Sequence, residues 1–543
     1  MEPRPVLTFT NPATGEQFGQ VPMTTPGEVR QMLGDLRLAS KTWSEKPVQE
    51  RVRILRKFQS VLVDAIDEIT AVLNQDCGKS RQDGLIEVLM TLDFLQYNLK
   101  HAPYWLRRRR KPSGLYLFKR CYVEPRPYGV VGVIAPWNYP FALSVPPVLA
   151  ALLAGNTVLL KPSEVTGATG VLVEQLFRRV PELAPYVRVL HGDGAVGAAL
   201  VQAAPDYLFL TGSTATGKKV VQAAAEHMTP VACELGGKDA MIVLEDADLP
   251  AAAHWGAWGA NFNAGQTCMG VERVYVVEPA YDEFVRLVVE ETRKLKMGYC
   301  EDQDCEYYVG PITDPRQVKI IERHLADALE KGARILTGGK QQGMFFEPAV
   351  LVDVDHSMLV MREETFGPLL PIMKVKDEAE ALRLANDCSF GLGGYVWSRD
   401  LERARRVAAQ MEAGTVLIND TIAQFAIPSL PFGGIKQTGT GRTHGKEGLL
   451  QFTRSYAYTE GSPPVAWDIA TIARKPGNYA LLSGVIHLVF GVSPRQRLQP
   501  LAGALEQLPR VDRKAALGLS APLWVGAAGV LAALAFARKR KRN

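Results

Sequence analysis

Cys268 lies in a short polar loop, Asn263–Arg273 (NAGQTCMGVER), between an apolar Trp/Ala/Gly-rich segment and a run that predicts a strand over Val274–Val277. A thiol on a loop at the boundary of an element can act as a nucleophile once it becomes a thiolate. The alternative is a buried free cysteine that packs as a small hydrophobe, which is the commoner role of this residue.

Two further groups of polar residues follow runs that predict buried strands. Glu234 follows the run Val231–Cys233 and precedes two glycines, so it is a candidate general base with space beside it. A surface glutamate before a turn would give the same pattern. Asn138 lies in Pro136–Pro140 (PWNYP), directly after the apolar run Gly129–Ala135.

The loop Thr211–Lys219 (TGSTATGKK) comes close to the phosphate loop GxxxxGK[ST]. Lys219 stands where that motif needs a hydroxyl to bind magnesium, which argues against an ATPase. Glycines at the start of a helix still let backbone amides approach an anion, so the loop is a candidate nucleotide site. An ordinary strand-to-helix turn is the alternative.

The elements that must position these groups alternate between strand and helix. Helical periodicity extends over about 25–77 and 85–106. The pattern then predicts strands over 129–135, 157–160, 187–190, 207–210 and 231–233, with helices over 141–154 and 167–178. Such alternation gives right-handed βαβ units in a parallel sheet, which binds ligands beyond the carboxyl ends of its strands. A second α/β stretch follows to about Asn386, so the predicted fold class is α/β.

Composition indicates a globular chain of two or three domains. It has 543 residues, 47% of them apolar and 22% charged. The net charge of +5 is confined largely to two basic runs, Arg107–Lys111 (a predicted solvated face) and Arg538–Arg542, which argues against a nucleic-acid surface. Seven cysteines, with Cys300 and Cys305 the nearest pair, form neither a disulfide framework nor a zinc pattern. We therefore expect reduced thiols, no metal and a cytosolic catalytic part, and the N-terminus predicts no secretory signal.

The C-terminal region carries an uncharged run of 23 residues, Ala515–Ala537, followed by the basic run Arg538–Arg542. About 20 apolar residues span a bilayer, but Pro522 shortens the uninterrupted helix, and a span would export the basic end. A helix lying in the cytosolic leaflet avoids this, with a second apolar segment, Ala480–Val492, alongside it. The alternatives are a core or oligomer helix with a disordered basic end, or a nuclear-localisation signal.

In this order the motifs PWNYP, KPSE, FLTGSTATG, ELGGK, GQTC, EETFGP and PFGGIK resemble the aldehyde dehydrogenase superfamily, from about residue 11 to 460. Leu210 and Thr438 are small departures from the family pattern. The resemblance implies a Rossmann-type NAD-binding domain (1–110 and 128–233), an α/β catalytic domain (234–435) and a β oligomerisation element (111–127 and 436–460). An extension (461–514) and a hydrophobic membrane-associating helix with a basic end (515–543) would follow. A homodimer or homotetramer is implied, with contact strands near 111–124 and 451–460.

The resemblance also implies a mechanism. The Cys268 thiolate would attack an aldehyde, while the Asn138 side chain and the Cys268 backbone N–H bind the oxyanion. The thiohemiacetal would expel hydride to the cofactor. Glu234 would then activate the water that hydrolyses the thioester, giving a free carboxylic acid.

The cofactor implied is NAD, with NADP less favoured. Lys161 and Glu164 would bind the adenosine ribose, where the Glu164 carboxylate would repel a 2′-phosphate. Gly212, Ser213 and Gly217 would line the pyrophosphate loop. On the nicotinamide side, Glu364 would hold the ribose, Phe366 would pack near the ring and Trp137 would flank the site.

The tail resembles that of the fatty aldehyde dehydrogenases, which implies a lipophilic or long-chain aldehyde and a membrane-associated enzyme with its catalytic domain in the cytoplasm. Three alternatives remain open. They are an enzyme for small polar aldehydes with a C-terminal helix that does not bind membrane, a non-catalytic scaffold of the same fold, and a membrane-tethered nucleotide-binding module.

Overall fold

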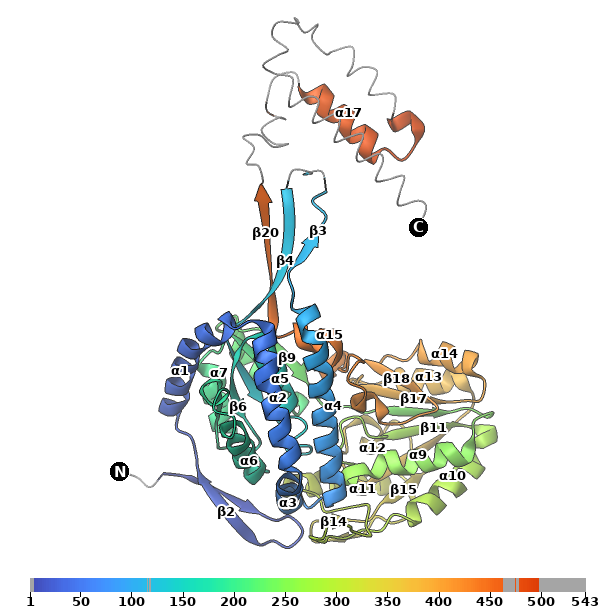
Figure 1. Cartoon of the computed structure of the whole chain (residues 1–543). Helices are drawn as coiled ribbons and strands as arrows, with labels where there is room; N and C mark the ends of the chain where they lie inside the picture. The colour runs from blue at the N-terminus through green and yellow to red at the C-terminus, as the bar shows by residue number, and fades with distance from the viewer. Residues whose placement is uncertain (1–3, 115, 117–118, 462–473, 475–477, 498–543) are drawn as a thin grey trace, which may run out of the picture. The chain divides into compact units, whose positions relative to one another are not determined.

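The computed structural model describes residues 4–114, 116, 119–461, 474 and 478–497 (Figure 1). The chain divides into two units, Met1–Arg107 with Pro125–Arg454, and Arg108–Glu124 with Ser455–Asn543. Two large sheets, both in the first unit, account for its architecture, and the α/β prediction is confirmed.

The first sheet has the strand order β19–β9–β8–β5–β6–β7. Every neighbouring pair is parallel except β19 with β9. The strands are β5 (Val130–Ile134), β6 (Thr157–Lys161), β7 (Val187–Val189), β8 (Tyr207–Thr211), β9 (Val231–Glu234) and β19 (Gly439–Thr440). The five parallel strands are those predicted from their β-branched runs, which are buried on both faces because helices cover the sheet.

Eight helices belong to this half: α1 (Pro26–Glu45), α2 (Val48–Asp64), α3 (Ile66–Cys77), α4 (Arg81–Trp105), α5 (Val145–Ala154), α6 (Gly167–Arg178), α7 (Gly194–Gln202) and α8 (Thr214–Ala225). The helical pattern predicted over about 25–77 corresponds to three helices, α1, α2 and α3. Pro47 separates α1 from α2, and Gly78 ends α3 in a left-handed conformation at φ +74°. Figure 1 shows α1, α2, α5 and α6 in blue to green around this sheet.

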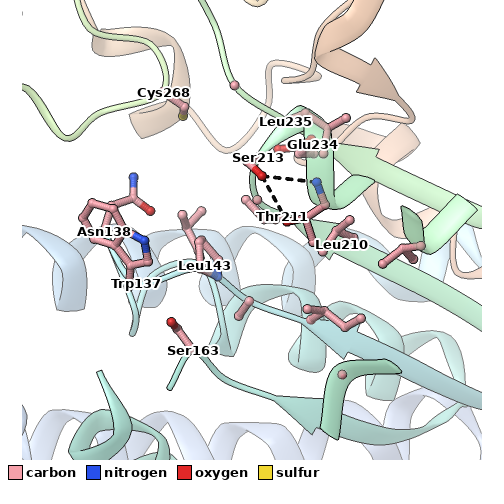
Figure 2. Close-up of a pocket in the computed structure, with 18 of the residues that line it drawn as sticks. Trp137, Asn138, Leu143, Ser163, Leu210, Thr211, Ser213, Glu234, Leu235 and Cys268 are labelled. Atoms are coloured by element: carbon pink, nitrogen blue, oxygen red, sulfur yellow. Dashed lines mark hydrogen bonds between the residues drawn. The ribbon is translucent and has the colours of Figure 1, made fainter. Parts of the chain in front are cut away.

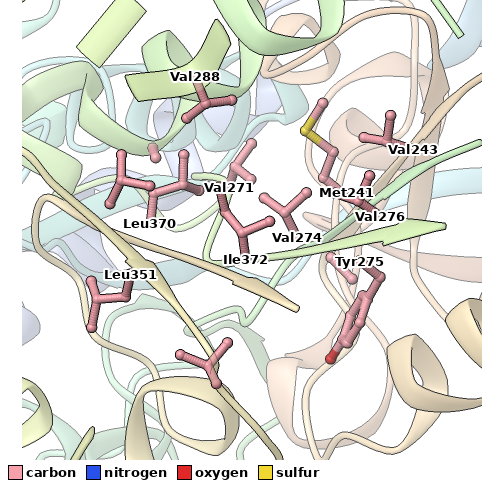
Figure 3. Close-up of a cluster of buried hydrophobic side chains, with 14 of the residues drawn as sticks. Met241, Val243, Val271, Val274, Tyr275, Val276, Val288, Leu351, Leu370 and Ile372 are labelled. Atoms are coloured by element: carbon pink, nitrogen blue, oxygen red, sulfur yellow. The ribbon is translucent and has the colours of Figure 1, made fainter. Parts of the chain in front are cut away.

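The second sheet has the order β12–β15–β16–β11–β10–β17–β18, and only β12 is antiparallel to its neighbour. Its strands are β10 (Ala240–Val243), β11 (Arg273–Val277), β12 (Arg334–Thr337), β15 (Ala349–Val352), β16 (Leu369–Val375), β17 (Gly393–Trp397) and β18 (Thr415–Ile418). Figure 3 shows the aliphatic core between this sheet and its helices, in which Met241, Val274 and Ile372 are fully buried. The helices are α9 (Leu249–Asn261), α10 (Glu278–Arg293), α11 (Pro315–Glu330), α12 (Leu359–Arg362), α13 (Glu378–Asn386) and α14 (Leu401–Ala408).

Smaller elements complete the first unit. The turn predicted around Asn11–Gly15 joins the antiparallel strands β1 (Val6–Thr10) and β2 (Gln17–Pro22). The others are β13 (Gln341–Gln342), β14 (Phe345–Phe346), α15 (Gly445–Leu450) and the short 3-10 helices at 184–186, 262–265, 423–426 and 436–438.

The second unit contains a three-stranded sheet of order β20–β4–β3 and the helix α17 (Asn478–Phe490). The strands are β3 (Arg109–Lys111), β4 (Lys119–Pro127) and β20 (Thr453–Gly461), of which β4 and β20 begin or end just inside the first unit. The basic run Arg107–Lys111 is therefore partly a strand, because its backbone pairs with β4.

Two expectations about the rest of the chain are affected. Cys300 and Cys305 form a disulfide, which corrects the prediction of seven reduced thiols; the loop between them brings their Cα atoms to 6.2 Å. The run 515–543, which was predicted to associate with membrane, lies outside the described residues, as does most of the 461–514 extension. Among the helices that are described, none is both long enough and apolar enough to cross a bilayer.

Candidate active site

A cavity of about 760 Å³ opens beyond the carboxyl ends of β5, β6, β8 and β9, beside the Cys268 loop. Figure 2 shows Cys268, Asn138 and Glu234 around it. Ten of the eleven site residues predicted from the sequence line this cavity: Trp137, Asn138, Lys161, Glu164, Gly212, Ser213, Glu234, Cys268, Glu364 and Phe366. Gly217 does not. It is buried in the first turn of α8, where an added Cβ would lie 2.7 Å from Leu235, so it allows close packing of α8 against the residue that follows β9.

The loop that carries Cys268 is fixed by its neighbours rather than by regular structure. It follows α9 through a 3-10 turn in which Asn263 and Ala264 have φ of 53° and 57°. The Gln266 side chain donates to the carbonyl of Asn263 at 2.9 Å and accepts from the Thr313 amide at 2.8 Å. Burial and the carboxyl groups of Asp239 and Glu234 raise the pKa of the partly buried Cys268 thiol above its ordinary value. At neutral pH the thiol therefore stays protonated unless a bound group or a nearby base lowers its pKa.

Asn138 is nearly fully buried and touches the same loop. Its side-chain amide donates to the Gln266 carbonyl at 3.0 Å. Because an amide NH₂ carries two hydrogens, one donor is left for a second acceptor. The backbone carbonyl of Asn138 accepts from Lys79 Nζ at 2.9 Å and from Asn263 Nδ2 at 3.0 Å.

Glu234 ends β9, and its carboxylate accepts a hydrogen bond from the Thr443 amide at 3.2 Å. Burial raises the pKa of Glu234 to about 8. The Thr443 hydroxyl lies 3.1 Å from Nδ1 of His444, and burial lowers the pKa of that histidine to about 3, so it is neutral. Sequence reasoning missed both residues, because they lie 209 and more residues from Glu234 in the chain and match no motif.

The cavity extends past the start of α8 to a polar end. There Lys161 Nζ pairs with a Glu164 oxygen at 2.8 Å, and Arg316 approaches the other oxygen at 4.0 Å. Ser213 caps α8 by accepting from the Thr216 amide at 3.2 Å, so the helix presents its amide end beside the cavity. Arg316 was also missed, since a lone arginine at the start of a helix carries no signal of its own.

The cavity lining also includes Glu364 and Phe366. Glu364 accepts from the Gly237 amide at 2.9 Å, and burial with the nearby Glu272 charge raises its pKa to about 8. The Phe366 ring meets the Trp137 ring edge to face at a centroid distance of 5.5 Å. Across the described ranges, no group of three or more His, Cys, Asp or Glu side chains could hold a metal ion.

The cavity suits a dinucleotide. Its volume is within the roughly 300–1,000 Å³ of small-molecule sites. Its lining includes the Lys161–Glu164 pair, Ser213 at the N-terminus of α8, and the paired rings of Trp137 and Phe366.

Comparisons with known proteins identify the family. A family model described as "Aldehyde dehydrogenase family" matches residues 2–457. The chain is 44% identical over 450 residues to a 4,4'-diapolycopene aldehyde oxidase of Methylomonas sp, covering 82% of this chain and 84% of that one.

Two solved structures share the fold. One, described as an E. coli NADP dependent enzyme, has a TM-score of 0.81 at 34% identity, over 84% of this chain and 95% of the other. The second is a betaine aldehyde dehydrogenase from Staphylococcus aureus in complex with NAD+, with a TM-score of 0.81 at 30% identity, over 85% of this chain and 93% of the other. The chain belongs to the aldehyde dehydrogenase family.

Proposed function

We propose that this enzyme oxidises a lipophilic aldehyde to the carboxylic acid, with a nicotinamide dinucleotide as oxidant. The main support is that Cys268, Asn138 and Glu234 line one cavity that continues to a charged end suited to a dinucleotide. The roles expected from the motifs are proposed for these residues. A scaffold function is disfavoured because all three reactive groups are present.

The proposed reaction begins with attack of the Cys268 thiolate on the aldehyde carbon. The carbonyl oxygen becomes an oxyanion. Two donors would bind it: the second hydrogen of the Asn138 side-chain amide and the backbone N–H of Cys268. The dinucleotide, when bound, supplies the acceptor for the hydride that leaves this carbon. Glu234 then takes a proton from the water that attacks the remaining thioester, which releases the acid and restores the thiol.

Lys161, Glu164 and Ser213 would hold the adenosine and pyrophosphate parts of the cofactor, and Glu364 with Phe366 the nicotinamide part. We propose NAD in preference to NADP, because the Glu164 carboxylate favours a ribose 2′-hydroxyl over a 2′-phosphate. Arg316, 4.0 Å from Glu164, is the group that would weaken this preference, since a guanidinium can pair with a phosphate.

The lipophilic substrate is proposed from the wall beside the thiol. Cys268 packs against a cluster that includes Met269, Leu392 and Phe432, and the Trp258 and Phe262 rings stack there at 4.8 Å. A relative of 44% identity is named 4,4'-diapolycopene aldehyde oxidase, and the proposal extends a substrate of that class to this chain. A small polar aldehyde is the alternative substrate.

We also propose that the division into NAD-binding, catalytic and oligomerisation regions holds for this chain, with β4 and β20 as contact strands in a homodimer or homotetramer. The run 515–543 would associate with membrane lipid and keep the catalytic domain on the cytoplasmic side. These proposals rest on the sequence resemblance.

One experiment tests the proposed reaction and substrate together. NADH and NADPH formation is followed with aldehydes from acetaldehyde to hexadecanal, using the full chain and its Cys268→Ser variant. We expect kcat/KM to rise with chain length, to be higher with NAD+ than with NADP+, and to vanish in the variant. Preference for short polar aldehydes would refute the substrate class. Absence of any reduced cofactor would support a scaffold, and ATP binding without NAD binding would support the nucleotide-binding module.

A further inference from the structure

Two buried Lys–Glu pairs make hydrogen bonds to segments that line the cavity, but none of the four charged residues lines it. In the first, Lys79 Nζ lies 2.6 Å from a Glu87 oxygen; in the second, Lys238 Nζ lies 2.6 Å from a Glu272 oxygen. All four residues are at most 5% exposed. Charges removed from water are costly even when paired, and apolar residues of the same size often give equal stability. Two such pairs beside one site therefore need an explanation other than stability.

The first pair holds the segment that carries Asn138. Lys79 Nζ donates to the Asn138 carbonyl at 2.9 Å and lies 4.6 Å from the centre of the Tyr139 ring. The second oxygen of Glu87 accepts from the consecutive amides of Phe141 and Ala142 at 3.1 and 3.0 Å. The pair thus binds the segment 138–142 at both ends by charged hydrogen bonds.

From this segment the contacts lead directly to the nucleophile loop, because the Asn138 side chain donates to the Gln266 carbonyl, two residues before Cys268. Burial lowers the pKa of Lys79, but the Glu87 carboxylate reverses the shift, and the net pKa is above the ordinary value. The lysine is therefore charged throughout the neutral range and keeps its three donors.

The second pair repeats the arrangement on the cofactor side. Lys238 Nζ donates to the Thr365 hydroxyl at 3.2 Å. Glu272 accepts from the consecutive amides of Thr365 and Phe366 at 3.1 and 2.9 Å. This pair fixes the segment between Glu364 and Phe366, and it makes no hydrogen bond to the segment 138–142.

We propose that the two pairs are separate positioning devices: Lys79–Glu87 sets Asn138 for the acyl chemistry at Cys268, and Lys238–Glu272 sets the Glu364–Phe366 segment for the dinucleotide. The inference rests on the proposed roles of Asn138 and Glu364. None of the four charged residues lines the cavity, so they would act through the segments they hold.

Each pair provides the matched control for the other. The variants are Lys79→Met with Glu87→Met, and Lys238→Met with Glu272→Met, which replace each pair by apolar side chains of similar length. Two readouts separate their effects. Hydrolysis of an activated ester, 4-nitrophenyl acetate, needs the nucleophile and the oxyanion donors but no dinucleotide. Binding of NADH, followed by its fluorescence, needs no acyl chemistry.

For the Lys79/Glu87 variant we expect kcat for ester hydrolysis to fall about 10²–10³-fold, as for loss of one oxyanion donor, with KM and the Kd for NADH within about twofold. For the Lys238/Glu272 variant we expect the Kd for NADH to rise about tenfold, near the low end of what a lost charged hydrogen bond costs. Because Glu272 lies four residues after Cys268 in the same loop, we expect ester hydrolysis to fall as well, but by less than in the Lys79/Glu87 variant. Equal losses in both readouts for both variants, or no loss, would overturn the proposal.

Asn138→Ala separates failure of this inference from failure of the proposed function. If Asn138→Ala keeps full ester hydrolysis, the oxyanion role itself is wrong. If it loses hydrolysis but the Lys79/Glu87 variant does not, only the positioning role is wrong. Adding Asn138→Ala to the Lys79/Glu87 variant should slow hydrolysis no further than Asn138→Ala alone, because residues that act through one contact are not additive.

Glu87→Gln covers the case in which the double variant does not fold. The Gln amide oxygen can still accept from both segment amides, because one Glu87 oxygen accepts both of those bonds. The Gln NH₂ group would then face Lys79, and the charge is lost. We expect ester hydrolysis to fall by about tenfold, with near-ultraviolet circular dichroism and NADH binding unchanged. A folded Glu87→Gln protein with full ester hydrolysis would overturn the proposal.

Discussion

At the scale of single residues, the protonation of Glu234 decides when the proposed second half of the reaction can run. The buried carboxyl has a pKa of about 8, so at neutral pH much of it carries a proton and cannot accept one from water. Arg442 and the Thr443 hydrogen bonds favour the charged form, but burial outweighs them. The environment therefore limits the base rather than activating it at neutral pH.

We predict that kcat rises with pH through about 8, because only the deprotonated carboxylate removes a proton from the hydrolytic water. Glu234→Gln should abolish this rise and lower kcat by about 10²–10⁴-fold. The measurement is the steady-state rate at saturating aldehyde between about pH 6 and pH 10. The first turnover is the internal control, since acylation of Cys268 does not use Glu234 and its burst of reduced cofactor should persist. A flat profile in the parent enzyme would contradict the assignment.

At the scale of elements, Gly265 is the residue that lets the nucleophile loop lie against the second sheet. Its φ is +75°, and a Cβ there would lie 2.3 Å from backbone atoms of Gly367. Backbone cannot move aside as a side chain can, and the segment after Gly367 leads into β16. Because Gly265 has no side chain, the backbone of the loop can pack directly against the Glu364–Gly367 segment.

Gly265→Ala should lower the free energy of unfolding by more than about 2 kcal/mol, since the conformational penalty of about 1–2 kcal/mol adds to the clash. It should also lower activity by displacing Cys268. Gly15→Ala is the matched control, with φ of +77° and no atom within 4 Å of the added Cβ. It should cost only the conformational penalty and leave activity intact. Urea unfolding and kcat are the measurements; equal costs for the two variants would show that the contact with Gly367 does not matter.

The same scale shows what the sequence can and cannot predict. The parallel strands were predictable because buried β-branched runs have a local pattern. Seven of the ten cavity residues followed from motifs at the ends of those strands, and Cys268, Glu364 and Phe366 followed from motifs in loops that precede β11 and β16. Lys79 and Thr443 were not, because each reaches the site through a contact between distant segments, with 59 residues separating Lys79 from Asn138. The Cys300–Cys305 disulfide depends on how one loop turns back, which cysteine spacing alone does not determine.

For the whole molecule, the proposed lipophilic substrate calls for a surface from which it could enter the active site. The helix α17 has a highly apolar sequence, yet Tyr479, Ile486 and Phe490 are 84%, 56% and 63% exposed. Large apolar side chains exposed together on one helix are typical of an interaction surface. The sequence beyond the described residues adds the uncharged run 515–537 and five basic residues. Together these features favour contact with an anionic membrane surface.

We predict that the full chain cosediments with vesicles containing phosphatidylserine. Each of Arg538–Arg542 should contribute about 1 kcal/mol at an anionic surface. Replacing the five by serine should therefore weaken binding strongly, as should raising the salt to about 1 M, where the Debye length falls to about 3 Å. The residual binding of the serine variant should equal that of the parent to uncharged phosphatidylcholine vesicles, because only the apolar contribution remains. Binding that ignores both salt and lipid charge would mean that the basic residues do not face the lipid. No binding to either vesicle would refute membrane association, and the long-chain substrate would then have to reach Cys268 from solution or from a carrier protein.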